Sequence, residues 1–256
     1  MFIYPNCRES IWLAILFILW VIVAQIIFIV VGVPSYLYSI LLYGSTTVAL
    51  ALAFQRKIMD RSILRFNKMK TQTLLFAVGG TLCIPWVHSL FYSVIPFPEF
   101  LKKIYTAVGN KEFNENYIYL IISSILLPFI MEIIFRGIIL RGLLTEYKPW
   151  KSITIAAVIY AMVWGIMTLL PLFGLLYGVW FGWLYVYSRN LWIGLLSFIA
   201  LQLMSVLYAI ISNSFTLPSQ VNSAMSGELW IINLAITILF CALTYFLHQT
   251  FKCHEN

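Results

Sequence analysis

The sequence predicts an all-α membrane protein built as a bundle of eight transmembrane helices. The composition, the spacing of the apolar segments and the distribution of the basic residues predict it. Of the 256 residues, 62% are hydrophobic and only 10% are charged, with a mean hydropathy of +0.94. Soluble domains carry about 25% charged residues, so this composition excludes a water-soluble domain. Because no soluble appendage or linker interrupts the apolar segments, we expect a single transmembrane domain over residues 1–256.

A helix that crosses a bilayer needs about 20 mostly apolar residues. Segments of this kind recur along the chain, and the first is expected to stay attached because no small-residue cleavage site follows it. Prolines at 85, 128 and 171 are expected to kink or begin helices. The eight predicted spans are residues 11–31, 34–54, 71–95, 117–135, 152–170, 171–188, 191–212 and 229–248.

The loops predict the orientation, because Lys and Arg gather on the cytoplasmic side of a membrane protein. The segment 56–70 carries six basic residues against Asp60. Placing it inside leaves only Lys102, Lys103 and Lys111 of the 16 basic residues outside, with both termini in the cytoplasm. This segment is either a topology anchor, the interpretation we favour, or a site for a partner or lipid headgroups. The outer segment 96–116 is expected to lie at the membrane surface.

The cysteines and histidines predict no metal site, disulfide framework or bound cofactor. The four Cys show no C-x-x-C spacing, and the three His form no H-E-x-x-H pattern. His88 falls in the third predicted span, where we expect it to pack in the bundle. The net charge of +7 follows from the cytoplasmic loops, so we expect no nucleic-acid partner.

One acidic residue lies inside an apolar span. Glu132 stands four residues before Arg136, and residues at i and i+4 share a helical face. A charge at this depth costs about 2.5–3.5 kcal/mol on the insertion scale, so it needs a partner inside the bundle. Glu132 either polarises a water or binds a substrate, or forms a purely structural salt bridge with Arg136.

The run MEIIFRG at 131–137 resembles the first motif of the CPBP family, the CAAX protease and bacteriocin-processing family, also called Abi. That motif reads Glu-Glu-x-x-x-Arg. The resemblance continues through YAMVW at 160–164, in place of Phe-x-x-x-His, through the glycine-rich run FGLLYGVWFGWLY at 173–185, and through FIALQ at 198–202, in place of His-x-x-x-Asn. It covers a CPBP-like core over residues 123–202 and implies an eight-helix bundle of the CPBP type.

Carried over position by position, the family's reactive residues are missing. In active members the first Glu and two His activate or coordinate the attacking water, and the Asn holds the oxyanion. The corresponding residues here are Met131, Trp164, Phe198 and Gln202. Met, Trp and Phe cannot take up a proton or bind a metal as Glu and His do. Glu132 and Arg136 alone keep the motif, and we expect apolar side chains to fill the former cavity.

The leading hypothesis is a catalytically inactive relative, a pseudoprotease that binds a membrane or cell-envelope protein as scaffold or regulator. The alternative is an endopeptidase of the CPBP type with an altered active site, acting in CAAX-like or bacteriocin processing or self-immunity. It would use Glu132 as base, with Arg136 and a relocated His. A transporter is a third option, but the spans offer little else to line a polar pathway. The resemblance implies a bacterial plasma membrane.

Gly174, Gly178 and Gly182 form a stripe of small residues that lets another helix approach closely. The stripe could form a homodimer through the lipid face. We favour packing inside the bundle.

Overall fold

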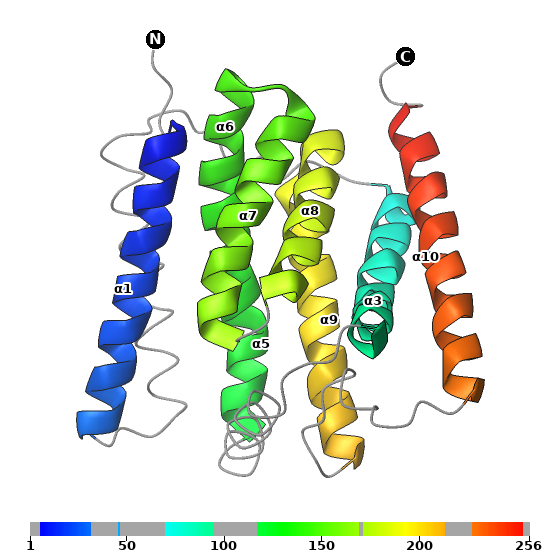
Figure 1. Ribbon diagram of the computed structural model, residues 1–256, viewed down its shortest axis with the longest axis horizontal. Helices are drawn as coiled ribbons and strands as arrows, with labels where there is room; N and C mark the ends of the chain where they lie inside the picture. The colour runs from blue at the N-terminus through cyan, green and yellow to red at the C-terminus, as the bar shows by residue number, and fades with distance from the viewer. Residues whose placement is uncertain are drawn as a thin grey trace.

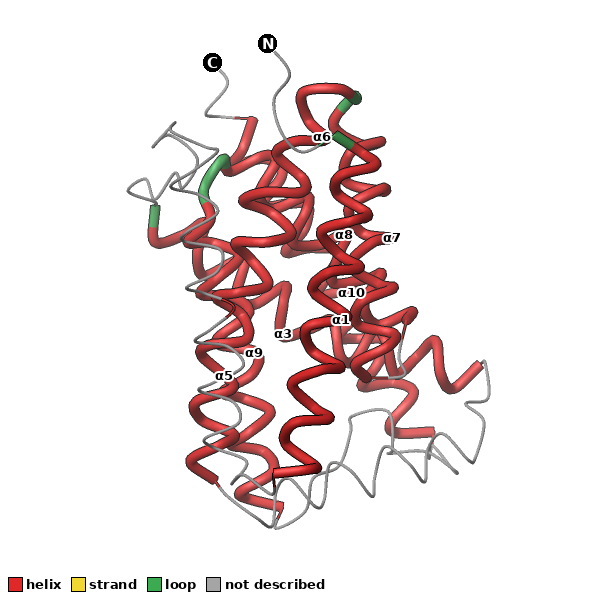
Figure 2. Tube along the Cα trace, turned by 90° about the vertical axis from the view of Figure 1, so that its left-hand side faces the viewer, coloured by secondary structure: helices red, strands yellow, loops and turns green. Residues whose placement is uncertain are grey.

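A computed structural model of the chain describes residues 6–31, 46, 70–94, 117–168, 171–212 and 227–252. Every regular element in these residues is a helix (Figure 2). They are α1 (Cys7–Val31), α3 (Thr71–Val94), α5 (Tyr117–Met131), the π-helix η2 (Glu132–Leu140), α6 (Arg141–Glu146), α7 (Pro149–Thr168), α8 (Pro171–Ser188), α9 (Leu191–Ser212) and α10 (Gly227–Lys252).

The helix ends follow local chemistry. Asn6 and Glu9 exchange backbone-to-side-chain hydrogen bonds of 2.8 Å at the start of α1, a capping box. Pro149 and Pro171 begin α7 and α8, where the missing N–H costs nothing. The Asn190 side chain accepts the Trp192 N–H at 3.0 Å and caps α9.

The turn between α8 and α9 is short and holds one unusual backbone conformation. Arg189 has a φ of 51°, which a residue other than glycine rarely adopts. Ser188 and Asn190 on either side are hydrogen-bonded to each other through the Asn190 N–H and the serine hydroxyl. The turn therefore reverses the chain within two residues and sends α9 back beside α8.

The helices run alongside one another, with α1 and α10 at opposite edges in Figure 1. Helix α7 packs closely on α8, α10 packs along α3, and α9 contacts both α3 and α5. Trp180 of α8 ties the α3 side to the centre, because its indole N–H donates to the Thr81 hydroxyl at 2.8 Å. The centre, where η2, α7, α8 and α9 meet, is a continuous hydrophobic core.

Most predicted spans coincide with described helices. The limits of α8 and α9 are the predicted ones, and α1 and α3 match closely. The span 34–54, the basic segment 56–70 except Lys70 and the segment 96–116 lie outside the described residues, apart from Thr46.

The predicted end of the span at residue 135 is wrong, because the helix continues through η2 and α6 to Glu146. The prediction took Arg136 as the polar boundary of the span. The structure buries Arg136 beside Glu132, so the charge does not interrupt the helix. Helix α7 likewise begins at Pro149, three residues before the predicted span.

Among the described residues, two helical stretches are long and apolar enough to cross a bilayer, Cys7–Ala24 and Ile121–Glu146. Shorter apolar stretches occupy Thr71–Val87, Pro149–Val163, Leu191–Leu207 and Leu234–Gln249. The prediction of membrane crossings is therefore supported for these two long stretches. The number of eight crossings stays a prediction.

Candidate functional site

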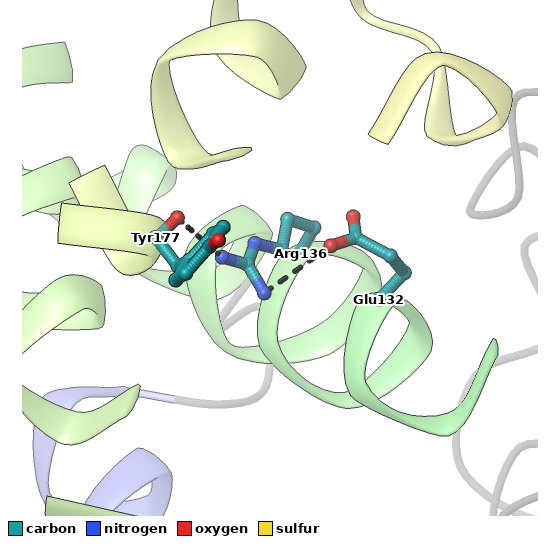
Figure 3. Close-up of polar contacts among 3 residues, drawn as sticks. All are labelled: Glu132, Arg136 and Tyr177. Carbon is teal, nitrogen blue, oxygen red and sulfur yellow. Dashed lines mark hydrogen bonds and ion pairs between the residues drawn. The ribbon is translucent and has the colours of Figure 1, made fainter. Parts of the chain in front are cut away.

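The two charged residues of the predicted motif lie on η2, Glu132 at its first position and Arg136 at its middle, in the centre of the bundle. Glu132 and Arg136 each expose only 2% of their surface. Arg136 Nη1 lies 3.3 Å from Glu132 Oε1 (Figure 3). This is an ion pair without hydrogen-bond alignment, because neither of these two atoms has a hydrogen-bond partner among the described residues. The pair that the i, i+4 spacing predicted therefore forms, although on a π-helix rather than an α-helix.

Arg136 makes its second polar contact with α8. Its Nη2 donates to the backbone carbonyl of Tyr177 at 3.2 Å (Figure 3). The guanidinium also lies over two aromatic rings, 4.4 Å from the centroid of Tyr160 and 5.2 Å from that of Phe181. A cation over an aromatic face is stabilised electrostatically, and more so away from water. Arg136 thus joins η2 to α7 and α8 through a single side chain.

Glu132 faces α9 on its other side. A methyl group built on Gly194 would lie 2.5 Å from Glu132 Oε2 and 3.1 Å from its Cδ. Any larger residue at this position would require the carboxylate to shift. The backbone of α9 therefore closes directly over Glu132.

Two of the four positions that the sequence resemblance assigns to the family's reactive groups hold buried apolar side chains. Met131 is fully buried, and Phe198 exposes 2% of its surface. Gln202 lies on α9 and is half-buried. Trp164 lies on α7, but its side chain is outside the described part of the structure.

Phe198 belongs to an aromatic stack beside the ion pair. Its ring lies 5.2 Å from the Phe181 ring and 6.4 Å from the Tyr177 ring, stacked on both. Phe135 and Tyr160 meet edge to face at 4.8 Å on the side of η2 and α7. Offset and edge-to-face pairs of this kind are the favourable ring arrangements. The two rings that lie over Arg136, those of Tyr160 and Phe181, therefore each pack against a further aromatic ring.

Sequence reasoning missed the residues that hold the pair in place. Gly194 has a usable signal, because it lies one helical turn before Phe198 and a lone small residue there indicates a close approach. Tyr160 and Phe181 fell within the quoted motifs without an assigned role. The Tyr177 contact uses a backbone carbonyl, for which the sequence carries no signal.

The described residues contain no group of three or more His, Cys, Asp or Glu that could hold a metal ion. Among the histidines, His248 lies on α10 with its ring 5.9 Å from that of Tyr187. The side chain of His88 and all of His254 lie outside the described residues. The chemistry available in the described site is therefore that of one buried ion pair and the hydroxyl groups near it.

Residues 113–204 match the family described as type II CAAX prenyl endopeptidase Rce1-like. This match confirms the resemblance to the CPBP family drawn from the sequence. The matched stretch contains Glu132 and Arg136 as well as the four altered motif positions. No curated protein and no solved structure matches the chain.

Proposed function

We propose, from the premise that residues 113–204 carry an Rce1-like domain, that this membrane protein no longer cleaves peptides. It works instead by binding another membrane or cell-envelope protein as its scaffold or regulator. The observation that carries the proposal is the burial of Met131 and Phe198 in the hydrophobic core at positions where catalysis in the family needs Glu and His. A thioether and a phenyl ring cannot act as a general base.

The surroundings of Glu132 support the same proposal. The carboxylate is paired with Arg136 and covered by the α9 backbone at Gly194. A general base must come within hydrogen-bond reach of the proton that it abstracts. A carboxylate held in this way is placed to fix the packing of η2 against α9 rather than to meet a substrate.

The distribution of charge supports a multi-pass orientation with both termini in the cytoplasm. Figure 1 places the start of α1, the α6–α7 connection, the α8–α9 turn and the end of α10 at one end of the bundle. These segments carry Arg8, Lys148, Lys151, Arg189 and Lys252. The described segments at the opposite end carry no Lys or Arg. Basic residues mark the cytoplasmic side.

Affinity purification tests the binding function. The detergent-solubilised wild type, Glu132→Gln and Glu146→Gln are purified side by side, and co-purifying proteins are identified and quantified by mass spectrometry. Glu146 is exposed at the end of α6 and serves as the matched control. We expect one membrane or envelope protein to co-purify stoichiometrically with the folded fraction of all three versions, because Glu132 contributes no chemistry.

The altered protease remains the second candidate, and one observation favours it. Glu132 Oε1 is buried without a hydrogen-bond partner among the described residues, so a polar group remains for a water to use. This candidate expects Glu132→Gln to retain a protein that the wild type releases in shortened form, with Glu146→Gln behaving as wild type. That result would overturn the binding proposal.

A further inference from the structure

Four side-chain atoms on η2, α8 and α9, two of them in the ion pair itself, are buried and have no hydrogen-bond partner among the described residues. They are Glu132 Oε1, Arg136 Nη1, the Tyr177 hydroxyl and Ser197 Oγ. Their residues expose at most 2% of their surface. Leaving a buried polar group without a partner costs about 1–3 kcal/mol, so several together in one place call for an explanation.

The four residues come from three helices that meet at one place. Glu132 and Arg136 lie 3.3 Å apart on η2, and Arg136 reaches the backbone of Tyr177 on α8. On α9, Gly194 contacts the Glu132 carboxylate, and Ser197 lies three residues later on the same face of the helix. The α8 and α9 helices are also joined here by the stacked rings of Tyr177 and Phe198.

The donors and acceptors in this set select one kind of ligand. The carboxylate oxygen only accepts hydrogen bonds and the guanidinium nitrogen only donates, whereas the two hydroxyl groups do both. An anion would be repelled by Glu132 and a cation by Arg136. Water serves both the donors and the acceptors, and buried waters typically make about three hydrogen bonds to such groups.

We propose that the junction of η2, α8 and α9 encloses ordered water that hydrogen-bonds Glu132, Arg136, Tyr177 and Ser197. The α9 backbone at Gly194 and the Phe181 and Phe198 rings separate this water from bulk solvent. The water stabilises the fold by completing the hydrogen bonds of the ion pair. The inference does not depend on whether the protein binds a partner or cleaves one.

Two conservative substitutions test the proposal through the sign of their effect. Tyr177→Phe and Ser197→Ala each remove one oxygen and leave the rest of the packing in place. If water bonds these hydroxyls, each variant loses a hydrogen bond, and we expect the midpoint of thermal unfolding in detergent to fall by about 2–4 °C. Tyr245→Phe, on the exposed face of α10, is the control and should leave the midpoint unchanged. An unchanged or raised midpoint for either core variant overturns the proposal, since removing a truly unpaired polar atom is neutral or stabilising.

Hydroxyl-radical labelling separates enclosed water from a direct protein contact. A short X-ray exposure generates radicals from water, and a buried side chain is modified only where water lies beside it. We expect Phe198 to be modified faster than Phe17, a buried phenylalanine on α1, and Ser197→Ala to reduce the modification of Phe198. Lowered midpoints with Phe198 modified no faster than Phe17 would mean that the hydroxyls bond protein directly, and would overturn the proposal of water.

Discussion

Among the described helix contacts that a glycine permits, those at Gly178 and Gly194 differ in what the glycine faces. In the α7–α8 contact, a Cβ on Gly178 would lie 2.7 Å from the Cα of Ala157, so two backbones touch. In the η2–α9 contact, a Cβ on Gly194 would meet the carboxylate of Glu132 at 2.5 Å. The first glycine allows an apolar close approach, and the second makes room for a charge.

The difference separates two sources of stability in one core. The α7–α8 contact rests on backbone proximity that no change of a side chain can relieve. The η2–α9 contact depends on the position of the Glu132 carboxylate, and that position depends on the ion pair with Arg136. The effect on stability of a substitution at the α7–α8 contact should therefore not depend on Glu132 or Arg136. At the η2–α9 contact, the effects of substituting Gly194, Glu132 and Arg136 should depend on one another.

The largest effect is expected from breaking the ion pair. Arg136→Met leaves the Glu132 charge buried without its partner, and breaking a buried pair in this way costs about 3–5 kcal/mol. We expect a large loss of folded protein, measured by size-exclusion chromatography and thermal unfolding of the detergent-solubilised variant.

The matched control removes both charges. Glu132→Gln/Arg136→Met leaves no isolated charge, so most of the lost stability should return. If the double variant is no more stable than Arg136→Met, the pair is not what holds η2 in place.

A smaller effect is expected at the backbone contact. Gly178→Ala forces α7 and α8 apart, and overpacking of this kind costs about 1–3 kcal/mol. Gly182→Ala on the same helix is the control, because its nearest neighbour is the Ile153 Cγ2 atom at 3.3 Å, a side chain that can shift. The midpoint of thermal unfolding should be lower for Gly178→Ala than for Gly182→Ala. Equal midpoints would contradict the close approach of the two backbones.

Gly194→Ala should destabilise the protein by a similar or smaller amount, about 1–2 kcal/mol, because the carboxylate can move only by weakening its contact with Arg136. The coupling is the decisive measurement. In the background Glu132→Ala/Arg136→Met the carboxylate is gone, and the same substitution should be neutral or stabilise by about 0.5–1 kcal/mol, as alanine does in a helix. Gly178→Ala should be equally harmful in both backgrounds. A loss at Gly194 that persists without the carboxylate would show that its neighbour is not Glu132.

The smallest effect is expected at the α3–α8 contact, which rests on a hydrogen bond between two uncharged side chains. Trp180→Phe removes the 2.8 Å hydrogen bond to Thr81 and should cost about 0.5–1.5 kcal/mol. Thr81→Val removes the same bond together with the bond from the Thr81 hydroxyl to the Ala77 carbonyl, so the double variant should lose less stability than the sum of the two single variants. Additive changes in the unfolding midpoint would mean that the bond contributes nothing.

Much of the fold was predictable because bilayer-length apolar runs leave few alternatives. The limits of α8 and α9 follow from Pro171 and from the Ser188–Arg189–Asn190 turn, both visible as sequence signals. The continuation of the helix through Arg136 was not predictable, because a charge inside an apolar run marks a boundary unless its partner is known to be buried with it. The sequence indicates the ion pair but not how deeply it is buried.

The site was predictable in its charges and not in its surroundings. The spacing of Glu132 and Arg136 predicted their contact. The altered motif predicted that the apolar side chains of Met131 and Phe198 are packed inside the bundle. The hydrogen bond to the Tyr177 carbonyl, the rings over Arg136 and the approach of Gly194 depend on how α7, α8 and α9 cross, which no local pattern encodes. The roles of these residues in function stay predictions.

The π-helix η2 also changes the angular position of the residues that follow it around the helix axis. A π-turn holds one residue more than an α-turn, and each residue of an α-helix is rotated by about 100° from the one before. Positions before Glu132 and after Leu140 therefore cannot be drawn on one helical wheel, although α5, η2 and α6 follow each other without a break. Because the wide turn takes up the extra residue, deleting one residue from a π-turn should keep Leu143, which is buried in the hydrophobic core, on its present face. The same deletion in a regular α-helix would rotate every later residue by about 100°.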